Sequence, residues 1–81
     1  MLYAIMKETY AWPKGDDAKP LEIIGPIAAK DSFEAAKECA EELAAKFDNH
    51  SFEGNSKYPY YWGHNKNDQY IYHYVIQAAS L

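Results

Sequence analysis

Apolar side chains recur at helical spacing between residues 31 and 47. Asp31 is suited to cap the N-terminus of such a helix, and Glu34 three residues later completes a capping-box pattern. The apolar face is rich in alanine between two phenylalanines, and it comprises Phe33, Ala36, Ala40, Leu43, Ala44 and Phe47, with Cys39 at its margin. Because alanine is small, we expect this helix to lie close to a sheet whose side chains supply most of the core volume.

Two extended segments are predicted before the helix. Met1 to Tyr10 is rich in apolar residues, and turn residues follow it. The second segment, Pro20 to Ala29, is interrupted by Gly25-Pro26. Proline cannot donate to a strand ladder, so this strand is expected to lie at a sheet edge or to bend at the glycine.

Two further strands are predicted after the helix. Tyr58 to Gly63 and Gln69 to Ala78 are expected to form a hairpin around Asn65 to Asp68, whereas the polar segment Asp48 to Lys57 is expected to be a loop. Residues 1–81 therefore predict a single small α+β domain in the order β-β-α-β-β, with one helix packed on one face of an antiparallel-rich four-stranded sheet.

The predicted hairpin has two unlike faces, because successive side chains of a strand point to opposite sides. With the turn at Lys66-Asn67, Tyr61 pairs with Tyr72, and one face carries Tyr60, Trp62, Ile71, His73 and Val75. The other face carries Tyr61, Tyr70, Tyr72, Tyr74 and Ile76. One helix covers only one face. Branched aliphatic side chains pack readily against an alanine-rich helix, and tyrosine tolerates partial exposure, so we expect the tyrosine face to be the open one.

An open tyrosine face predicts a binding surface, because Tyr and Trp side chains dominate interface hot spots. We therefore expect a small non-enzymatic interaction module, of an accessory or inhibitor type, that binds a protein partner or forms a homodimer. The expected binding residues are Tyr61, Tyr70, Tyr72, Tyr74 and, in the first loop, Trp12. The structural alternative is that the tyrosines only stabilise the sheet through cross-strand pairs.

Single-stranded nucleic acid or nucleotide binding is the alternative function for the same face, since bases stack on aromatic rings. The charge opposes it. The chain has 8 basic and 12 acidic residues, a net charge of −4, and only Lys57 and Lys66 lie near the tyrosines. Nucleic acid is therefore the less favoured partner.

The sequence contains no pattern of catalytic or metal-ligating residues. His50, His64 and His73 are not at helical ligand spacing from one another or from Cys39, so no metal site is expected. Cys39 lies among helix glutamates and fits a buried small side chain better than a nucleophile. Neither a phosphate-binding glycine loop nor a nucleophile elbow occurs. We expect no catalytic residues and no cofactor.

The single cysteine excludes a disulfide within the chain and is typical of a reducing compartment, which predicts a cytoplasmic protein. No apolar run approaches the roughly 18 residues of a spanning helix, and the first residues lack a signal-peptide pattern, so no membrane association is expected. The layout resembles that of many short bacterial and phage-encoded proteins, including some anti-CRISPR inhibitors. The likeness is one of size and arrangement without a shared motif, and it favours binding over catalysis.

Overall fold

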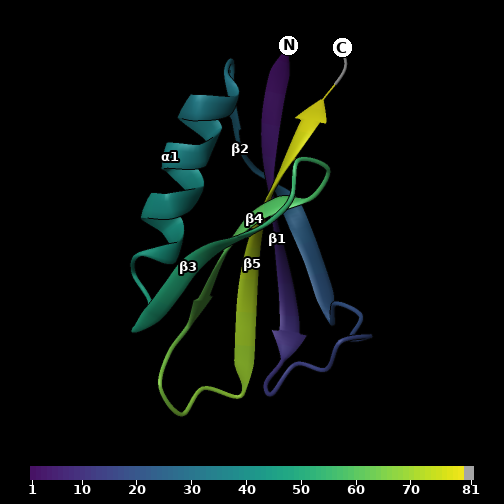
Figure 1. Cartoon of the computed structure of the whole chain (residues 1–81), viewed down its shortest axis with the longest axis vertical. Coiled ribbons are helices and arrows are strands. Elements are labelled where there is room, and N and C mark those ends of the chain that lie inside the picture. Colours follow the sequence, from purple (N-terminus) through teal and green to yellow (C-terminus); the bar gives the residue numbers. More distant parts are fainter. Residues whose placement is uncertain (80–81) are drawn as a thin grey trace.

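A computed structural model describes residues 1–79, which form one five-stranded antiparallel sheet with a helix on one face (Figure 1). The elements are β1 (Leu2–Ala11), β2 (Glu22–Lys30), α1 (Phe33–Ala44), β3 (Asn49–Gly54), β4 (Pro59–His64) and β5 (Tyr70–Ala79). The strand order is β2-β1-β5-β4-β3. The α+β class with one helix on the sheet is confirmed, but the prediction of four strands is wrong.

The additional strand is β3, in the segment that was expected to be a loop. It pairs with β4 along its whole length, and each of its residues is exposed because it forms a sheet edge. Its sequence, NHSFEG, lacks the apolar alternation of a half-buried strand, so the pattern could not reveal it. Gly54 ends the strand with a φ of +101°, where an added Cβ would overlap the carbonyl oxygen of Tyr58.

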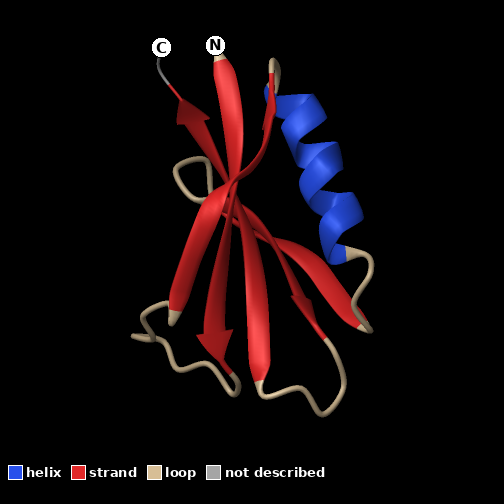
Figure 2. Ribbon diagram, turned by 180° about the vertical axis from the view of Figure 1, so that it is seen from behind, coloured by secondary structure: helices blue, strands red, loops and turns tan. Residues whose placement is uncertain are grey.

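The centre of the sheet is the ladder between β1 and β5, which pairs Leu2 with Ala79 and continues to Ala11 with Tyr70. Both strands are ten residues long and are paired throughout. Figure 2 shows β1 beginning at the same end of the sheet at which β5 ends. The two most distant parts of the described chain are therefore neighbours in the fold.

β2 lies at the other edge of the sheet, as Gly25-Pro26 predicts. Its register with β1 shifts at this point, so that Gly25, Pro26 and Ile27 stand opposite Met6 alone. Gly25 has a φ of +153°, and an added Cβ would lie 2.7 Å from the sulfur of Met6. The bulge thus depends on a residue without a side chain.

The helix starts one residue later than the capping box predicts. Ser32 is the N-cap, and its Oγ accepts a hydrogen bond from the Ala35 N–H at 3.1 Å. The three buried alanines are Ala36, Ala40 and Ala44. Phe47 follows the end of the helix and still packs against the core, together with Phe33, Cys39 and Leu43. The predicted apolar face is confirmed.

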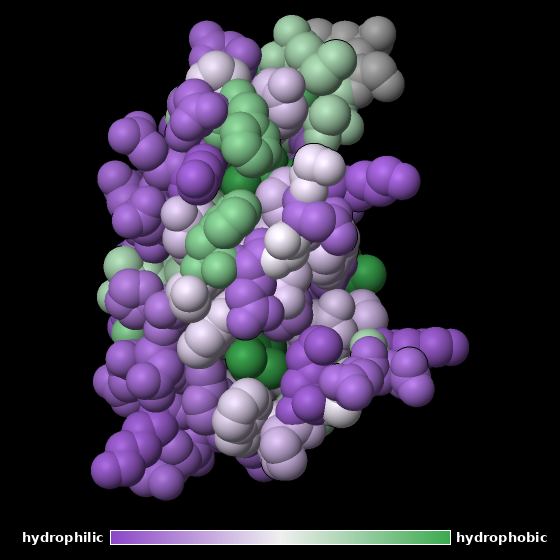
Figure 3. All heavy atoms as spheres, viewed as in Figure 1, coloured by the Kyte–Doolittle hydropathy of each residue, from purple (hydrophilic) through white to green (hydrophobic). Residues whose placement is uncertain are grey.

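The helix connects the two edge strands, β2 and β3, and therefore crosses the sheet from one edge to the other. It contacts all five strands. Figure 3 shows a hydrophilic surface on the left of the view, where Figure 1 places α1 and β3. Within residues 1–79 no helix is long and apolar enough to cross a membrane.

Candidate binding surfaces

The tyrosine face lies beneath α1, so the predicted orientation of the sheet is wrong. Tyr61 and Tyr74 are only 7% and 5% exposed and belong to a core cluster with Ile5, Ile76 and the three helix alanines. Tyr72 is half-buried, and its ring stacks on Phe47 with 5.2 Å between centroids. Of the predicted binding residues, Tyr61, Tyr72 and Tyr74 are therefore core or partly buried, whereas Tyr70 and Trp12 remain exposed.

The reason for this orientation is volume. The three alanines of the helix contribute little side-chain volume to the core, and the rings of Tyr61 and Tyr74 supply more volume than isoleucine or valine would. A tyrosine hydroxyl can still reach a polar partner at the margin of this core. The Tyr61 hydroxyl, for example, donates a hydrogen bond to Glu41 Oε2 on α1 at 3.2 Å.

The division of the hairpin into two faces is confirmed, although its register is not. Tyr61 pairs with Tyr74 instead of Tyr72, and Trp62 pairs with His73. The difference from the predicted register is two residues, and because side chains alternate with a period of two, each one stays on its predicted face.

The opposite face, called the open face below, is not bare. Ile71, His73 and Val75 are buried on it although α1 lies on the other side. The His73 ring lies between two tyrosine rings, with centroids 4.6 Å from Tyr10 and 4.3 Å from Tyr60. Aromatic side chains from β1 and β4 thus form a second, smaller packed layer there.

A buried carboxylate joins this layer across the sheet. Glu8 Oε1 on β1 accepts hydrogen bonds from the hydroxyl of Tyr10 at 2.6 Å and from that of Tyr58 at 2.5 Å. Tyr58 precedes β4, so its side chain reaches across β5 to β1. Burial, followed by the hydrogen bond to Glu8, raises the pKa of both tyrosines. Both hydroxyls are therefore protonated donors at neutral pH.

A cleft of about 270 Å³ opens on this face beside the loop that follows β1. Its walls combine three large aromatic side chains with two carboxylates and one ammonium group, and the lining residues are Trp12, Lys14, Gly15, Asp16, Glu53, Tyr60, Trp62, Ile71 and His73. Trp12 is 47% exposed and lies against His64, with 4.2 Å between the ring centroids. We refer to this site as the aromatic cleft.

His73 lines the aromatic cleft and is 4% exposed, and its Nδ1 is buried without a hydrogen-bond partner. Burial, and to a smaller extent the nearby Lys14 ammonium, lowers the pKa of His73 to about 4. The imidazole is therefore neutral at pH 7, and a buried polar atom without a partner costs free energy until a ligand or water supplies one.

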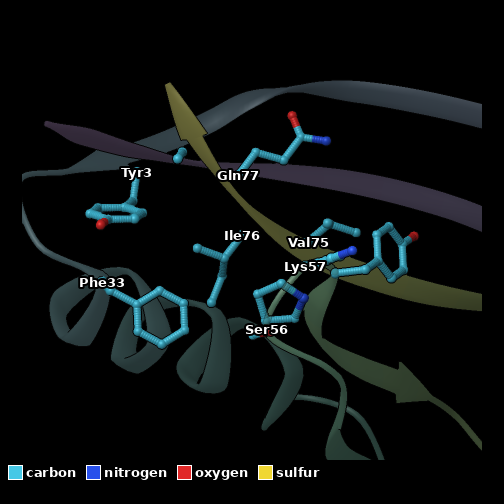
Figure 4. Close-up of a pocket in the computed structure, with 10 residues that line it drawn as sticks. Tyr3, Phe33, Ser56, Lys57, Val75, Ile76 and Gln77 are labelled. Carbon is cyan, nitrogen blue, oxygen red and sulfur yellow. The ribbon is translucent and has the colours of Figure 1, made fainter. Parts of the chain in front are cut away.

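A second cleft of about 270 Å³ lies on the helix side (Figure 4). Figure 4 shows Ile76 pointing from β5 toward the helix and Phe33. Phe33 meets Tyr3 edge to face, with centroids 5.8 Å apart, while Ser56 and Lys57 lie in the turn before β4. Lys57 is the one charged side chain among its described lining residues, so this cleft offers no pair of groups for chemistry.

Large aliphatic side chains are exposed along β2 and just before it, a feature that the sequence analysis missed. Leu21, Ile23, Ile24 and Ile27 are between 40% and 62% exposed. Figure 3 shows a hydrophobic side chain projecting at the right of the view, on the side where Figure 1 draws the first part of β2 in blue. The signal was the apolar run around Gly25-Pro26, because an edge strand leaves such a run uncovered.

The remaining candidate residues are dispersed. Cys39 is half-buried on α1, and His50 is exposed on β3. His64 is buried, and its Nε2 lies 3.0 Å from the Asp68 carbonyl oxygen. Within residues 1–79, no three histidine, cysteine or acidic side chains gather where they could hold a metal ion.

Neither a protein-family model, nor a curated protein, nor a solved structure matches this chain.

Proposed function

We propose that this chain is a small non-enzymatic protein-interaction module that forms a homodimer through the exposed edge of β2. The supporting observation is the exposure of four large aliphatic side chains there, Leu21, Ile23, Ile24 and Ile27. Ile23 and Ile24 are consecutive strand residues, so this edge is apolar on both faces of the sheet. Large exposed apolar surface of this kind marks interaction sites in small proteins. Burying one of them completely contributes about 1.5–3 kcal/mol, which is a useful gain for a chain of 81 residues.

The charges of β2 favour a second copy of the chain as the partner. Glu22 stands at one end of the strand and Lys30 at the other. When two β2 strands lie antiparallel about a two-fold axis, Glu22 of each copy comes beside Lys30 of the other. The same register sets Ile23 beside Ala29 and Ile24 beside Ala28 of the other copy, so each of these isoleucines faces an apolar residue.

The contact is made through side chains and not through a continuous strand ladder. Pro26 has no N–H to donate, and the bulge at Gly25 displaces the middle of the strand. This bulge also limits open-ended pairing of further chains, so the association stops at two copies.

The predicted tyrosine surface is not part of this proposal, because Tyr61 and Tyr74 lie beneath α1. For the same reason we do not propose nucleic-acid stacking on that face. We place the module in the cytoplasm, where the single thiol of Cys39 remains reduced.

Light scattering across micromolar to millimolar concentrations tests the proposal. We expect the wild-type chain to show twice its own mass, and Ile23→Lys to dissociate at a concentration about ten-fold higher or more, since it places a charge in the apolar contact. The matched control is His50→Lys, which adds the same charge to the exposed edge strand β3 and leaves the mass unchanged. A wild-type chain that remains a monomer throughout would refute the homodimer.

A further inference from the structure

The aromatic cleft, which is distinct from the β2 edge, combines π faces with carboxylates. Trp12 and Trp62 supply two indole rings, and Asp16 and Glu53 supply two negative charges against the single positive charge of Lys14. We propose that the aromatic cleft binds the guanidinium group of a small organic cation, stacked on an indole ring and paired with Glu53.

The indole rings provide the stacking surface. A cation within about 6 Å of an aromatic face is attracted by the ring quadrupole, and tryptophan is the best such partner. A guanidinium group is planar and weakly hydrated, so it stacks where a compact ammonium ion does not. Trp12 is held from one side by the His64 ring, 4.2 Å away, and still exposes 47% of its surface. The stacking surface is therefore supported before a ligand arrives.

Glu53 provides the charge. Its Oε2 accepts a hydrogen bond from the Tyr60 hydroxyl at 3.0 Å, which holds the carboxylate at the cleft. A carboxylate has about four acceptor positions, so one bond from tyrosine leaves capacity for the paired N–H groups of a guanidinium. The same hydrogen bond, after burial, raises the pKa of Tyr60 to about 12, and so no tyrosinate forms at neutral pH.

His73 adds a neutral imidazole to the lining of the cleft. Its ring lines the cleft and has a buried nitrogen without a partner. Because burial keeps this imidazole neutral at pH 7, it does not repel a cation, and one of its two nitrogens is free of a proton. A ligand with several N–H donors suits this acceptor, whereas a quaternary ammonium group has none to offer.

Lys14 is the one positively charged group in the cleft and repels a cation. Replacing it therefore tests whether the ligand is positively or negatively charged. Its ammonium lies 5.0 Å from the centroid of the Tyr10 ring, at the position that a cation favours. Lys14→Gln should therefore tighten a cationic ligand and weaken an anionic one. Glu53→Gln should do the reverse.

Intrinsic fluorescence is a direct readout, because the chain has two tryptophans and both line the aromatic cleft. The probe is N-acetyl-arginine amide, and its uncharged counterpart of the same shape is N-acetyl-citrulline amide. We expect saturable fluorescence change with the arginine derivative and at least about ten-fold weaker binding of the citrulline derivative, the typical loss when a charge-assisted hydrogen bond is removed.

Three variants complete the experiment, each checked for folding by circular dichroism. Glu53→Gln should weaken the arginine derivative about ten-fold, Lys14→Gln should strengthen it, and the control Glu42→Gln, on the exposed face of α1, should change nothing. These residues lie at the surface or in a loop, so the variants are expected to fold. The proposal is overturned if neither probe binds, if both bind equally, or if Glu53→Gln strengthens binding.

Discussion

The two faces of the sheet are both packed, but by opposite means. On the face under α1, small helix alanines meet large rings from the sheet, and the contact is almost entirely apolar. On the open face, His73 and Glu8 are buried among tyrosines, and they are held by ring stacking and hydrogen bonds to a carboxylate. The first face resembles an ordinary core, while the second is a polar aromatic layer that also leaves a cleft.

This difference indicates where binding can reside. An apolar interior with a close-packed helix offers stability and few groups for recognition. A layer that contains a buried carboxylate and a neutral histidine without all its partners costs free energy to maintain. A ligand that supplies the missing hydrogen-bond partner offsets part of this free energy. For this reason we propose the cation site on the open face.

The largest expected effect is on the face under the helix. Tyr74→Ala removes a ring from the centre of this core, so we expect it to lower the free energy of unfolding by about 3–5 kcal/mol, measured by urea denaturation. The control is Tyr70→Ala, on the same strand and the same stripe but exposed, which should change stability by no more than about 0.5 kcal/mol. Equal losses in the two variants would show that the tyrosine stripe is not oriented as described.

A smaller effect is expected at the hydrogen-bonded centre of the open face. Glu8→Ala deprives the hydroxyls of Tyr10 and Tyr58 of their acceptor, and we expect a loss of about 2–3 kcal/mol in the same assay. Tyr58→Phe should cost only about 1 kcal/mol, because Glu8 keeps its bond from Tyr10. If Glu8→Ala is as stable as the wild type, the open-face layer does not contribute to folding.

The third effect depends on pH. The pKa of His73 is about 4 in the folded chain against 6.5 for an ordinary histidine, so the unfolded chain binds more protons between these values. The free energy of unfolding is therefore highest above about pH 7, and it decreases as the pH falls toward 4 because protonation of His73 favours the unfolded chain. We expect the wild type to lose about 1–3 kcal/mol more than His73→Phe between pH 7 and pH 4.5. Parallel stability curves for the two proteins would contradict the burial of this imidazole.

The sequence correctly predicted the features that depend on residues close together in the chain. The alternation of Tyr70 to Ile76 placed every hairpin side chain in the correct group of neighbours, and Gly25-Pro26 marked the edge strand. The alanine face of the helix was also correct, apart from the transfer of the N-cap from Asp31 to Ser32.

What the sequence did not determine was the choice between two plausible cores. Both hairpin faces are rich in aromatic and aliphatic residues, so polarity alone does not indicate which face lies beneath the helix. The side-chain volume needed beside Ala36 and Ala40 favours the tyrosine face. Long-range contacts were equally hidden. The bond from Tyr58 to Glu8 joins residues 50 positions apart, and the strand β3 exists because β4 offers it an edge.

The pairing of the first strand with the last has a consequence for how the chain acquires its structure. Leu2 pairs with Ala79, so the central ladder requires two segments that are far apart in the sequence to come together. Closing so long a loop loses conformational entropy before the stabilising contacts of the ladder form. Folds of this kind therefore form slowly compared with helical bundles of similar size. During synthesis, β1 therefore remains without its main neighbour until Tyr70–Ala79 has left the ribosome.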